Sequence, residues 1–380
     1  MNHRALWMDA DLELYRDMVR RFVANEIAQH QEKWSKQQQV DRELWNQAGA
    51  LGVLLADVPD EYGGAGGNFA HMAILFEELS YAGATAFGAH AHACAAHAIL
   101  NHGSDAQKRK YLPRLASGDM VATIAMLEPD AGSDLKRLGT SALKDRDGYR
   151  INGSKTFVSN GVLADLIVVA AKTDPDSGAD GISLFLIETR DNPACRVVRL
   201  LEKIGQQGQD TCEIRFDDVR ISTENLLGGV ENHGLHQLMQ EQPYERVLIG
   251  VSAAAAIERA VRLTVEYTRE RKAFGKALIE MQNTRFKLAE AKTQATIARS
   301  LIDHCIARMC DGRMDPVTAA LAKLWLSEAE GRVIDECLQL FGGYGYMLEY
   351  PIAQMYADAR ARRICGGTSE TMKEIVADSL

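Results

Sequence analysis

Apolar residues recur at helical spacing along the first part of the chain. They stand three or four positions apart with charged residues between them, as Leu12, Tyr15, Val19, Phe22, Val23 and Ile27. This spacing is typical of a helix that buries one face. The pattern returns over residues 72–81, 85–100 and 105–115, where Asp105 is the expected N-cap of the last helix. We therefore predict a helical N-terminal domain over residues 1–120.

Short β-branched runs replace this pattern in the middle of the chain. They cover residues 149–151, 166–171, 182–187 and 212–216, and Asn-Gly, Asp-Gly and Ser-Gly pairs separate them. Runs of this length with such turn residues predict strands joined by tight turns. We therefore expect a β domain over residues 121–231.

Long helical patterns return over residues 248–271, 282–310, 316–340 and 352–363, and Pro243 predicts a kink near the start of the first helix. This predicts a helical C-terminal domain over residues 232–380. The order is helical, β, helical, without alternating strand–helix–strand units, which argues against a doubly wound sheet. No Gly-x-Gly-x-x-Gly motif follows a strand, so a Rossmann nucleotide site is not indicated.

Composition narrows the class of protein. The chain has 380 residues, of which 46% are hydrophobic and 25% charged, as in ordinary folded domains. The net charge is −9 and the basic residues form no stripe, so we expect no nucleic-acid partner. No apolar run reaches the roughly 20 residues of a membrane helix. Seven scattered cysteines without a Cys-x-x-Cys pair indicate reduced thiols, hence a cytoplasmic location, or the mitochondrial matrix for a processed eukaryotic chain.

Two segments around the β domain have residue types that suit a flat ligand. Residues 125–134 (Ala-Met-Leu-Glu-Pro-Asp-Ala-Gly-Ser-Asp) let backbone amides approach a ligand closely, although a plain turn explains them equally well. In residues 152–161, Phe157 and Ser159 share one strand face, so an aromatic ring and a hydroxyl can meet a heteroaromatic ring. A half-buried hairpin is the structural alternative.

Three further segments suit an anion. Residues 269–276 (Arg-Glu-Arg-Lys-Ala-Phe-Gly-Lys) can clamp a pyrophosphate, or form a solvated helix end. Residues 339–346 (Gln-Leu-Phe-Gly-Gly-Tyr-Gly-Tyr) offer exposed amides, or a helix C-cap. Residues 364–370 (Ile-Cys-Gly-Gly-Thr-Ser-Glu) open the final helix, where Thr368 or Ser369 is the expected cap and the first amides can hold an anion or a carbonyl oxygen.

In this order and at these separations, the five segments resemble the acyl-CoA dehydrogenase family over essentially the full chain, and most closely its long-chain and isovaleryl-CoA dehydrogenase branch. The resemblance implies an α+β fold with an N-terminal helical domain, a middle β-barrel-like domain and a C-terminal four-helix bundle. It implies FAD at a dimer interface, in dimers of dimers. It also implies dehydrogenation of an acyl-CoA to the trans-2-enoyl-CoA, with hydride transfer to flavin N5 and electron-transfer flavoprotein as the electron acceptor.

The position of the catalytic base departs from the commonest family pattern. Most relatives carry a glutamate in a Tyr-Glu-Gly-Thr motif, where this chain has Gly366. The long-chain and isovaleryl branch has the same glycine and takes its base from the helix that opens the C-terminal domain. That motif is Gln-Pro-Tyr-Glu-Arg-Val-Leu here, so the resemblance assigns the base to Glu245. The nearest competitor is Glu241, one turn earlier, which we interpret as a surface carboxylate.

The resemblance also assigns the binding residues. Cofactor contacts are expected from Ile124, Ala125, Met126, Leu127, Ser133, Phe157, Val158, Ser159, Arg271, Phe274, Gln282, Gln339, Leu340, Phe341, Gly342, Gly343, Thr368, Ser369 and Glu370. Among these, Arg271, Gln282 and residues 339–343 are expected to reach the FAD of a partner subunit. Substrate contacts are expected from Ser133, His236, Pro243, Tyr244, Arg246, Gly366 and Gly367, and the Gly366 amide is expected to polarise the thioester carbonyl.

Several features leave alternatives open. Leu127 replaces a usual Thr or Ser, and Gln354 a usual Lys or Arg. His90, Cys94 and His97 share one helix face at metal-ligand spacing, but we expect core packing and no metal. The small residues around them predict a roomy pocket for a medium, long or branched acyl chain. Alternatives are a carrier-protein thioester dehydrogenase, a flavin oxidase, or a non-catalytic helical interaction protein, which only the missing glutamate at 366 supports.

Overall fold

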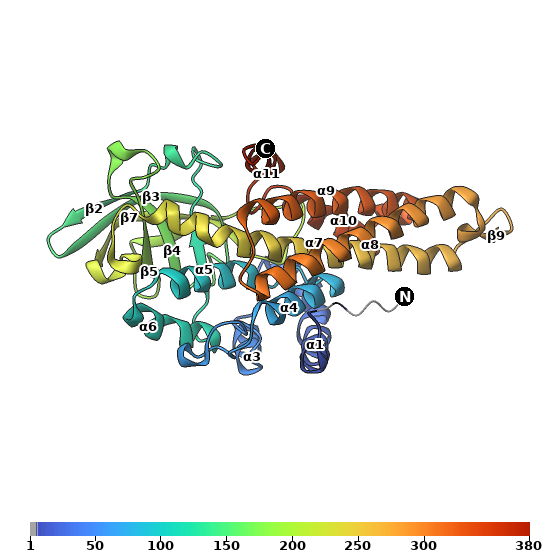
Figure 1. Cartoon of the computed structure of the whole chain (residues 1–380), viewed down its shortest axis with the longest axis horizontal. Coiled ribbons are helices and arrows are strands. Elements are labelled where there is room, and N and C mark those ends of the chain that lie inside the picture. The colour runs from blue at the N-terminus through green and yellow to red at the C-terminus, as the bar shows by residue number, and fades with distance from the viewer. Residues whose placement is uncertain (1–4, 6) are drawn as a thin grey trace.

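Helices lie at both ends of the chain and a sheet lies between them in sequence. The computed structural model describes residue 5 and residues 7–380. In Figure 1 the sheet lies at one end of the molecule, the long C-terminal helices extend away from it, and the N-terminal helices lie along one side. The N-terminal helices are α1 (Ala10–Phe22), α2 (Gln31–Gln37), α3 (Glu43–Ala50), α4 (Phe69–Ala82), α5 (Ala89–His102) and α6 (Asp105–Ala116).

Capping residues set the ends of these helices. Asp9 caps α1 by accepting a hydrogen bond from the Leu12 amide at 2.8 Å. The expectation that Asp105 caps α6 is wrong, because Ser104 accepts from the Gln107 amide and the Gln107 side chain accepts from the Ser104 amide. This reciprocal pair is a capping box, which satisfies two helix-end donors at once. The helix expected from residue 85 begins only at Ala89, because residues 83–88 form a loop.

The middle of the chain forms one seven-stranded sheet. Its strands are β1 (Ala122–Ala125), β2 (Ser141–Asp145), β3 (Gly148–Ser159), β4 (Leu166–Lys172), β5 (Ile182–Glu188), β6 (Cys195–Leu200) and β7 (Thr211–Ser222). The order is β1-β4-β2-β3-β7-β6, with β5 on β4. Strand β1 runs parallel to β4, whereas β3 and β7 pair antiparallel along most of their length. Within the described residues β6 pairs only with β7, so the sheet of the middle domain has a free edge at β6.

The C-terminal part is built on one long helix. Helix α7 (Gly234–Glu270) has 37 residues, hence a length of about 55 Å. The sequence pattern placed its start near residue 248, but helical geometry continues through Pro243 from Gly234. A short hairpin, β8 (Lys272–Ala273) and β9 (Lys276–Ala277), follows it. Then come α8 (Gln282–Cys310), α9 (Pro316–Phe341), α10 (Pro351–Arg362) and α11 (Ser369–Ala377).

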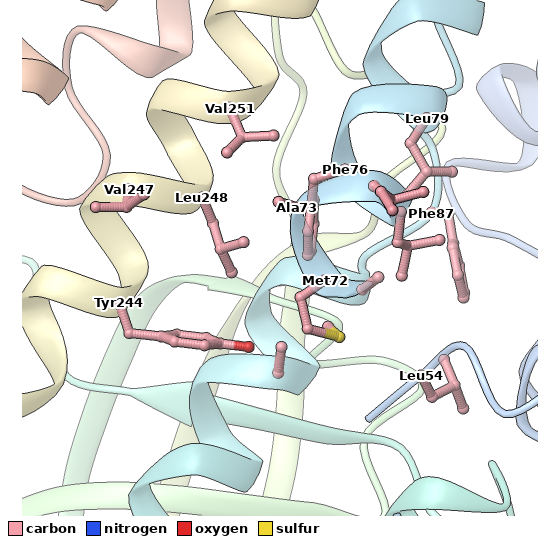
Figure 2. Close-up of a cluster of buried hydrophobic side chains, with 14 of the residues drawn as sticks. Leu54, Met72, Ala73, Phe76, Leu79, Phe87, Tyr244, Val247, Leu248 and Val251 are labelled. Carbon is pink, nitrogen blue, oxygen red and sulfur yellow. The ribbon is translucent and has the colours of Figure 1, made fainter. Parts of the chain in front are cut away.

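Two buried apolar clusters hold these parts together. The larger one joins the N-terminal helices to α7, α8 and α9, and the second fills the interior of the sheet. Figure 2 shows part of the larger cluster, where Leu248 and Val251 of α7 face Ala73 and Phe76 of α4. In the described part of the chain, no helix is both long and apolar enough to cross a membrane.

A buried ion pair fixes the segment that follows β1. Lys155 on β3 is fully buried, and its ammonium donates to Glu128 Oε1 at 2.8 Å and to the Met126 carbonyl at 2.9 Å. Glu128 also accepts from the amides of Gly139 and Thr140. Burial lowers the pKa of Lys155 to about 8, although Glu128 opposes the shift. The pair therefore holds residues 126–128 against β3.

Lys155→Met is expected to lower the free energy of unfolding by about 3–5 kcal/mol, because it leaves the Glu128 carboxylate buried without its counter-ion. Lys144→Met is the control, since Lys144 is 71% exposed and pairs with Glu231 on the surface. That change is expected to cost less than about 1 kcal/mol. Denaturant unfolding of both variants measures the difference, and equal costs would contradict a structural role for the buried pair.

Candidate functional site

Glu245 and Gly366 lie against each other. Glu245 is in the first half of α7, and Gly366 is in the turn between α10 and α11. A Cβ atom built on Gly366 would lie 3.7 Å from Glu245 Oε1 and 2.5 Å from Ile249 Cδ1. The backbone of Gly366 also has a φ of +64°, a region that glycine adopts without strain. Position 366 therefore favours glycine, and the Glu245 carboxylate lies at van der Waals distance from the point where a Cβ would stand.

Two buried cations hold the turn that contains Gly366. Arg246 is 2% exposed and donates from Nε to the Gly366 carbonyl at 3.3 Å. Lys323 on α9 is fully buried and donates from Nζ to the Gly367 carbonyl at 2.5 Å. Burial lowers the pKa of Lys323. The two bonds fix both peptide planes that follow the Gly366 amide.

The Gly366 amide itself is left available. Among the backbone hydrogen bonds of the described residues, none has this N–H as donor. The Glu245 carboxylate lies near the point where a Cβ of Gly366 would stand, so a carboxylate and an unused backbone donor are neighbours. An acid–base group next to an unpartnered amide can remove a proton and stabilise the oxygen on which negative charge then develops.

Glu241 does not share this space. Its carboxylate accepts from Asn101 Nδ2 and His102 Nε2, each at 2.9 Å, so it is tied to the end of α5. Its side chain is only 13% exposed, so our interpretation of Glu241 as a surface carboxylate is wrong. His236, an expected substrate contact, is exposed in the first turn of α7.

Tyr244, next to Glu245 in sequence, faces the N-terminal helices (Figure 2). Its hydroxyl donates to Asp57 Oδ2 at 3.0 Å, and its ring stacks on His97 with centroids 3.8 Å apart. His97 Nε2 lies 3.0 Å from the same Asp57 oxygen. The Asp57 carboxylate raises the pKa of His97 against the effect of burial, and His97 lowers the pKa of Asp57. We conclude that Asp57 and protonated His97 form a buried ion pair.

The helix face with His90, Cys94 and His97 is packed rather than open. His97 pairs with Asp57, Cys94 is buried, and His90 Nε2 lies 3.5 Å from the Glu245 carbonyl. Within the described residues, no three His, Cys, Asp or Glu side chains are placed to hold a metal ion.

Residues expected to meet the flavin ring gather where β1 and β3 end. A bulge gives Phe157 a φ of +56° and breaks the strand alternation, and its ring is 65% exposed. The Thr123 hydroxyl donates to the Ser159 carbonyl and the Thr156 amide to the Leu127 carbonyl, so both segments are held together. The side chains of Ala125 and Val158 are buried, so only their backbones can meet a ligand. An exposed aromatic on a fixed backbone fits the face of a flavin.

A second group of expected cofactor residues lies at the opposite end of the molecule, around β8 and β9 (Figure 1). Arg271 places its guanidinium 5.4 Å from the centre of the Tyr344 ring, and Phe274 is 97% exposed. Phe341 is buried and stacks on Tyr267 at 4.2 Å. The segment of α7 from Glu245 to Glu270 rises by about 38 Å, so one chain does not bring the two groups of cofactor residues together.

The last expected segment starts α11. Thr368 is confirmed as the N-cap, because its hydroxyl accepts from the Thr371 amide at 3.2 Å. Ser369 is buried and donates to Glu328 Oε1 at 2.7 Å, which ties α11 to α9. Glu370 is exposed. Gln354, where a cation is usual in the family, donates to Asp358 on the same helix.

Lys323 and Asp57 were missed by the sequence reasoning. Lys323 has a signal, because it stands inside the apolar helical run of residues 319–326, where a charge predicts a buried partner. Asp57 has no such signal in the sequence, because its partners lie on α5, 40 residues along the chain, and on α7, 187 residues along the chain.

Comparisons with known proteins cover the whole of this architecture. Residues 9–119 match the acyl-CoA dehydrogenase N-terminal domain, residues 123–219 the middle domain and residues 232–380 the C-terminal domain. The chain belongs to the acyl-CoA dehydrogenase family. It is 42% identical to the mitochondrial long-chain specific acyl-CoA dehydrogenase of Sus scrofa over 96% of this chain and 85% of that protein.

The two branches that the sequence resembles are both found. The chain is 34% identical to the mitochondrial isovaleryl-CoA dehydrogenase of Oryza sativa, over 99% of this chain and 92% of that one. The crystal structure of acyl-CoA dehydrogenase from Geobacillus kaustophilus superposes with a TM-score of 0.96 at 39% identity, covering 99% of each chain. The resemblance and the fold are therefore confirmed.

The buried Asp57–His97 pair predicts a pH-dependent stability. His97 has a raised pKa in the folded state, so its contribution is complete below its ordinary pKa of about 6.5 and is lost as the pH rises through the folded value. The negative charge of Glu241 also favours the protonated form of His97. The stability difference between wild type and His97→Gln is expected to shrink from pH 6 towards pH 10. Exposed His304→Gln is the control. A difference that grows with pH would contradict the pair.

Lys323→Met is expected to loosen the turn at Gly366, because the Gly367 carbonyl loses its donor. Hydrogen–deuterium exchange of the peptide covering residues 364–370 is expected to rise by at least tenfold, with kcat falling more than KM rises. Exposed Lys292→Met on α8 is the control. Unchanged exchange at this turn, with exchange raised across α9 instead, would show that Lys323 acts only in packing.

Proposed function

We propose that Glu245 is the base with which this FAD-dependent acyl-CoA dehydrogenase removes the α-proton of its substrate. The contact between the Glu245 carboxylate and the space beside Gly366 carries the proposal. A glycine at 366 keeps a backbone donor and frees room for a carboxylate that comes from α7. This geometry also removes the only support for a non-catalytic protein, which was the missing glutamate at 366.

The α-proton of a thioester is too weakly acidic for a free carboxylate. Its removal needs a donor that stabilises the enolate oxygen as charge develops. The Gly366 amide is the proposed donor, and the bonds from Arg246 and Lys323 to the Gly366 and Gly367 carbonyls support this role. When bound, FAD supplies the acceptor for the β-hydride. Glu245 then holds the α-proton.

A second copy of the chain is proposed to complete each cofactor site. The residues around Phe157 would meet the isoalloxazine, with Ser133 and residues 124–127 beside it, and Thr368, Ser369 and Glu370 near the adenosine or pyrophosphate. Arg271, Gln282 and residues 339–343, at the far end of the bundle, would reach the FAD of the partner (Figure 1). The span of about 38 Å along α7 supports this arrangement, and dimers of dimers follow from the family.

The acyl chain is proposed to be medium, long or branched. Small residues support this, because Ala73 on α4, Ala93 on α5 and Ala256 on α7 belong to the same apolar cluster as Tyr244. His236, Pro243, Tyr244, Arg246 and Gly367 are proposed to shape the substrate site. Electron-transfer flavoprotein is the proposed acceptor of the electrons, in the cytoplasm or the mitochondrial matrix.

Glu245→Gln tests the base directly. The variant is expected to bind FAD and acyl-CoA normally but to lose flavin reduction by about 10²–10⁴-fold, because the amide cannot take the proton. The measurement is anaerobic bleaching of the flavin on mixing with acyl-CoAs of several lengths and branching patterns. Glu241→Gln is the matched control one turn earlier and is expected to bleach at the wild-type rate. Equal bleaching by Glu245→Gln and wild type would exclude Glu245 as the base.

A further inference from the structure

A polar cavity, apart from the site around Glu245, lies where the end of α4 meets α7, α9 and α10. Its volume is about 70 Å³, and its lining includes Ser80, Gly83, Arg259, Glu330, Asp358 and Arg362. The loop at Gln206, which follows β6, also reaches α10 here, because its amide donates to Asp358. The N-terminal helices, the middle domain and the C-terminal helices therefore meet at this cavity. None of its residues belongs to the site around Glu245.

One wall of the cavity carries an unsatisfied carboxyl group. Glu330 is fully buried, and one of its oxygens accepts from Arg362, whereas Oε2 has no hydrogen-bond partner. Burial raises the pKa of Glu330 to about 7 although Arg362 opposes the shift, and Asp358 adds to it. The carboxyl group is thus able to donate as well as accept near neutral pH. A buried polar atom without a partner is uncommon and calls for a ligand or water.

The lining of the cavity also contains the guanidinium of Arg259, which is unpaired. Arg259 packs on Gly83 so closely that a Cβ there would lie 1.8 Å from its Nη1. In the described part of the chain, Arg259 forms no hydrogen bond or ion pair, and burial lowers its pKa. Asp358 does not neutralise it by contact, because its oxygens are already used by Thr85, Gln206 and Gln354.

The cavity lies at the far end of the α4–α7 contact, and Tyr244, the sequence neighbour of Glu245, lies at its near end. Helices α4 and α7 run side by side, from the Phe69–Tyr244 ring contact at 5.4 Å to Gly83 and Arg259. Along α7, Ala256 is about 17 Å and Arg259 about 21 Å beyond Glu245. Leu248 and Val251, which lie between Glu245 and Ala256 on α7, face α4 (Figure 2). One bilayer leaflet of acyl chains is roughly 15 Å thick, so only a long chain spans this distance.

We propose that the cavity at Arg259 and Glu330 binds a carboxylate at the far end of a long acyl chain, so that ω-carboxyacyl-CoA thioesters are substrates. This inference rests on the proposed function, since it places the thioester at Glu245. The guanidinium of Arg259 can donate two parallel hydrogen bonds to a carboxylate, and Glu330 can donate a third from Oε2. A free small carboxylate has the same chemistry and is the alternative source of the ligand.

Binding to the Glu245→Gln holoenzyme tests the proposal without turnover. The probes are long straight-chain acyl-CoAs and their ω-hydroxy and ω-carboxy analogues, with affinity measured by titration calorimetry. The ω-carboxy analogue is expected to bind about 10- to 100-fold more tightly than the unsubstituted thioester, as two or three charge-assisted hydrogen bonds imply. Arg259→Met and Glu330→Leu, which remove the hydrogen-bond donors, are expected to reduce that preference, and Arg262→Met, one turn further along α7 and about half exposed, to preserve it.

Other outcomes separate the sources of failure. Equal affinity for the ω-carboxy and unsubstituted thioesters, with both oxidised by wild type, would overturn this inference and leave the dehydrogenase intact. Failure of wild type to oxidise any acyl-CoA would overturn the proposed function itself. Arg259-dependent stabilisation by free acetate, with no chain-end preference, would overturn the assignment to the acyl chain. If Arg259→Met does not fold, Arg259→Lys keeps the charge and is expected to lose most of the preference with the second hydrogen bond.

Discussion

The carboxylate of Glu245 lies against the turn at Gly366, a turn whose conformation suits a residue without a side chain. A Cβ at position 366 would meet Ile249 Cδ1 at 2.5 Å and would lie in ordinary contact with Glu245, and the φ of Gly366 is positive. The turn is then held from behind by its carbonyls, which Arg246 and Lys323 bind from α7 and α9. These constraints act together, since a loose turn would leave neither a defined space for the carboxylate nor a fixed direction for the Gly366 amide.

Buried charges fix the helices that carry this arrangement. Asp57 connects the loop before α4 to His97 on α5 and to Tyr244 on α7, next to Glu245. On the other side of α4, Glu77 pairs with Arg16 of α1 and Arg299 of α8. Each pair joins elements that are far apart in sequence. A buried charge that loses its partner is strongly destabilising, so these contacts select one packing of the N-terminal helices on the bundle.

Much of the fold follows from local pattern. The helical, β and helical regions, four of the strands and the cap at Thr368 follow from periodicity and turn residues. The pairing of Glu245 with Gly366 follows from two motifs 121 residues apart, and the structure places them in contact. Local pattern fails where tertiary contacts decide. Helix α7 extends back to Gly234 through a proline, and the cap of α6 moves to Ser104 because Gln107 completes the reciprocal bond.

The partners of buried charges are the least predictable part of the site. Lys323 is visible as a charge in an apolar helical run, yet its partner is a backbone carbonyl 44 residues away that no side-chain pattern marks. The partner of Asp57 is likewise brought close only by the fold. Arg259 and Glu330 belong to the same class, since only their arrangement around a cavity distinguishes them from ordinary charges on a helix.

A crystal structure of the FAD-loaded protein with a bound, unreactive acyl-CoA analogue tests the central claim most directly. The account predicts that a Glu245 oxygen lies within about 3 Å of the α-carbon region and that the Gly366 amide donates to the thioester oxygen. Another carboxylate at the α-carbon, or a thioester oxygen turned away from Gly366, would contradict it.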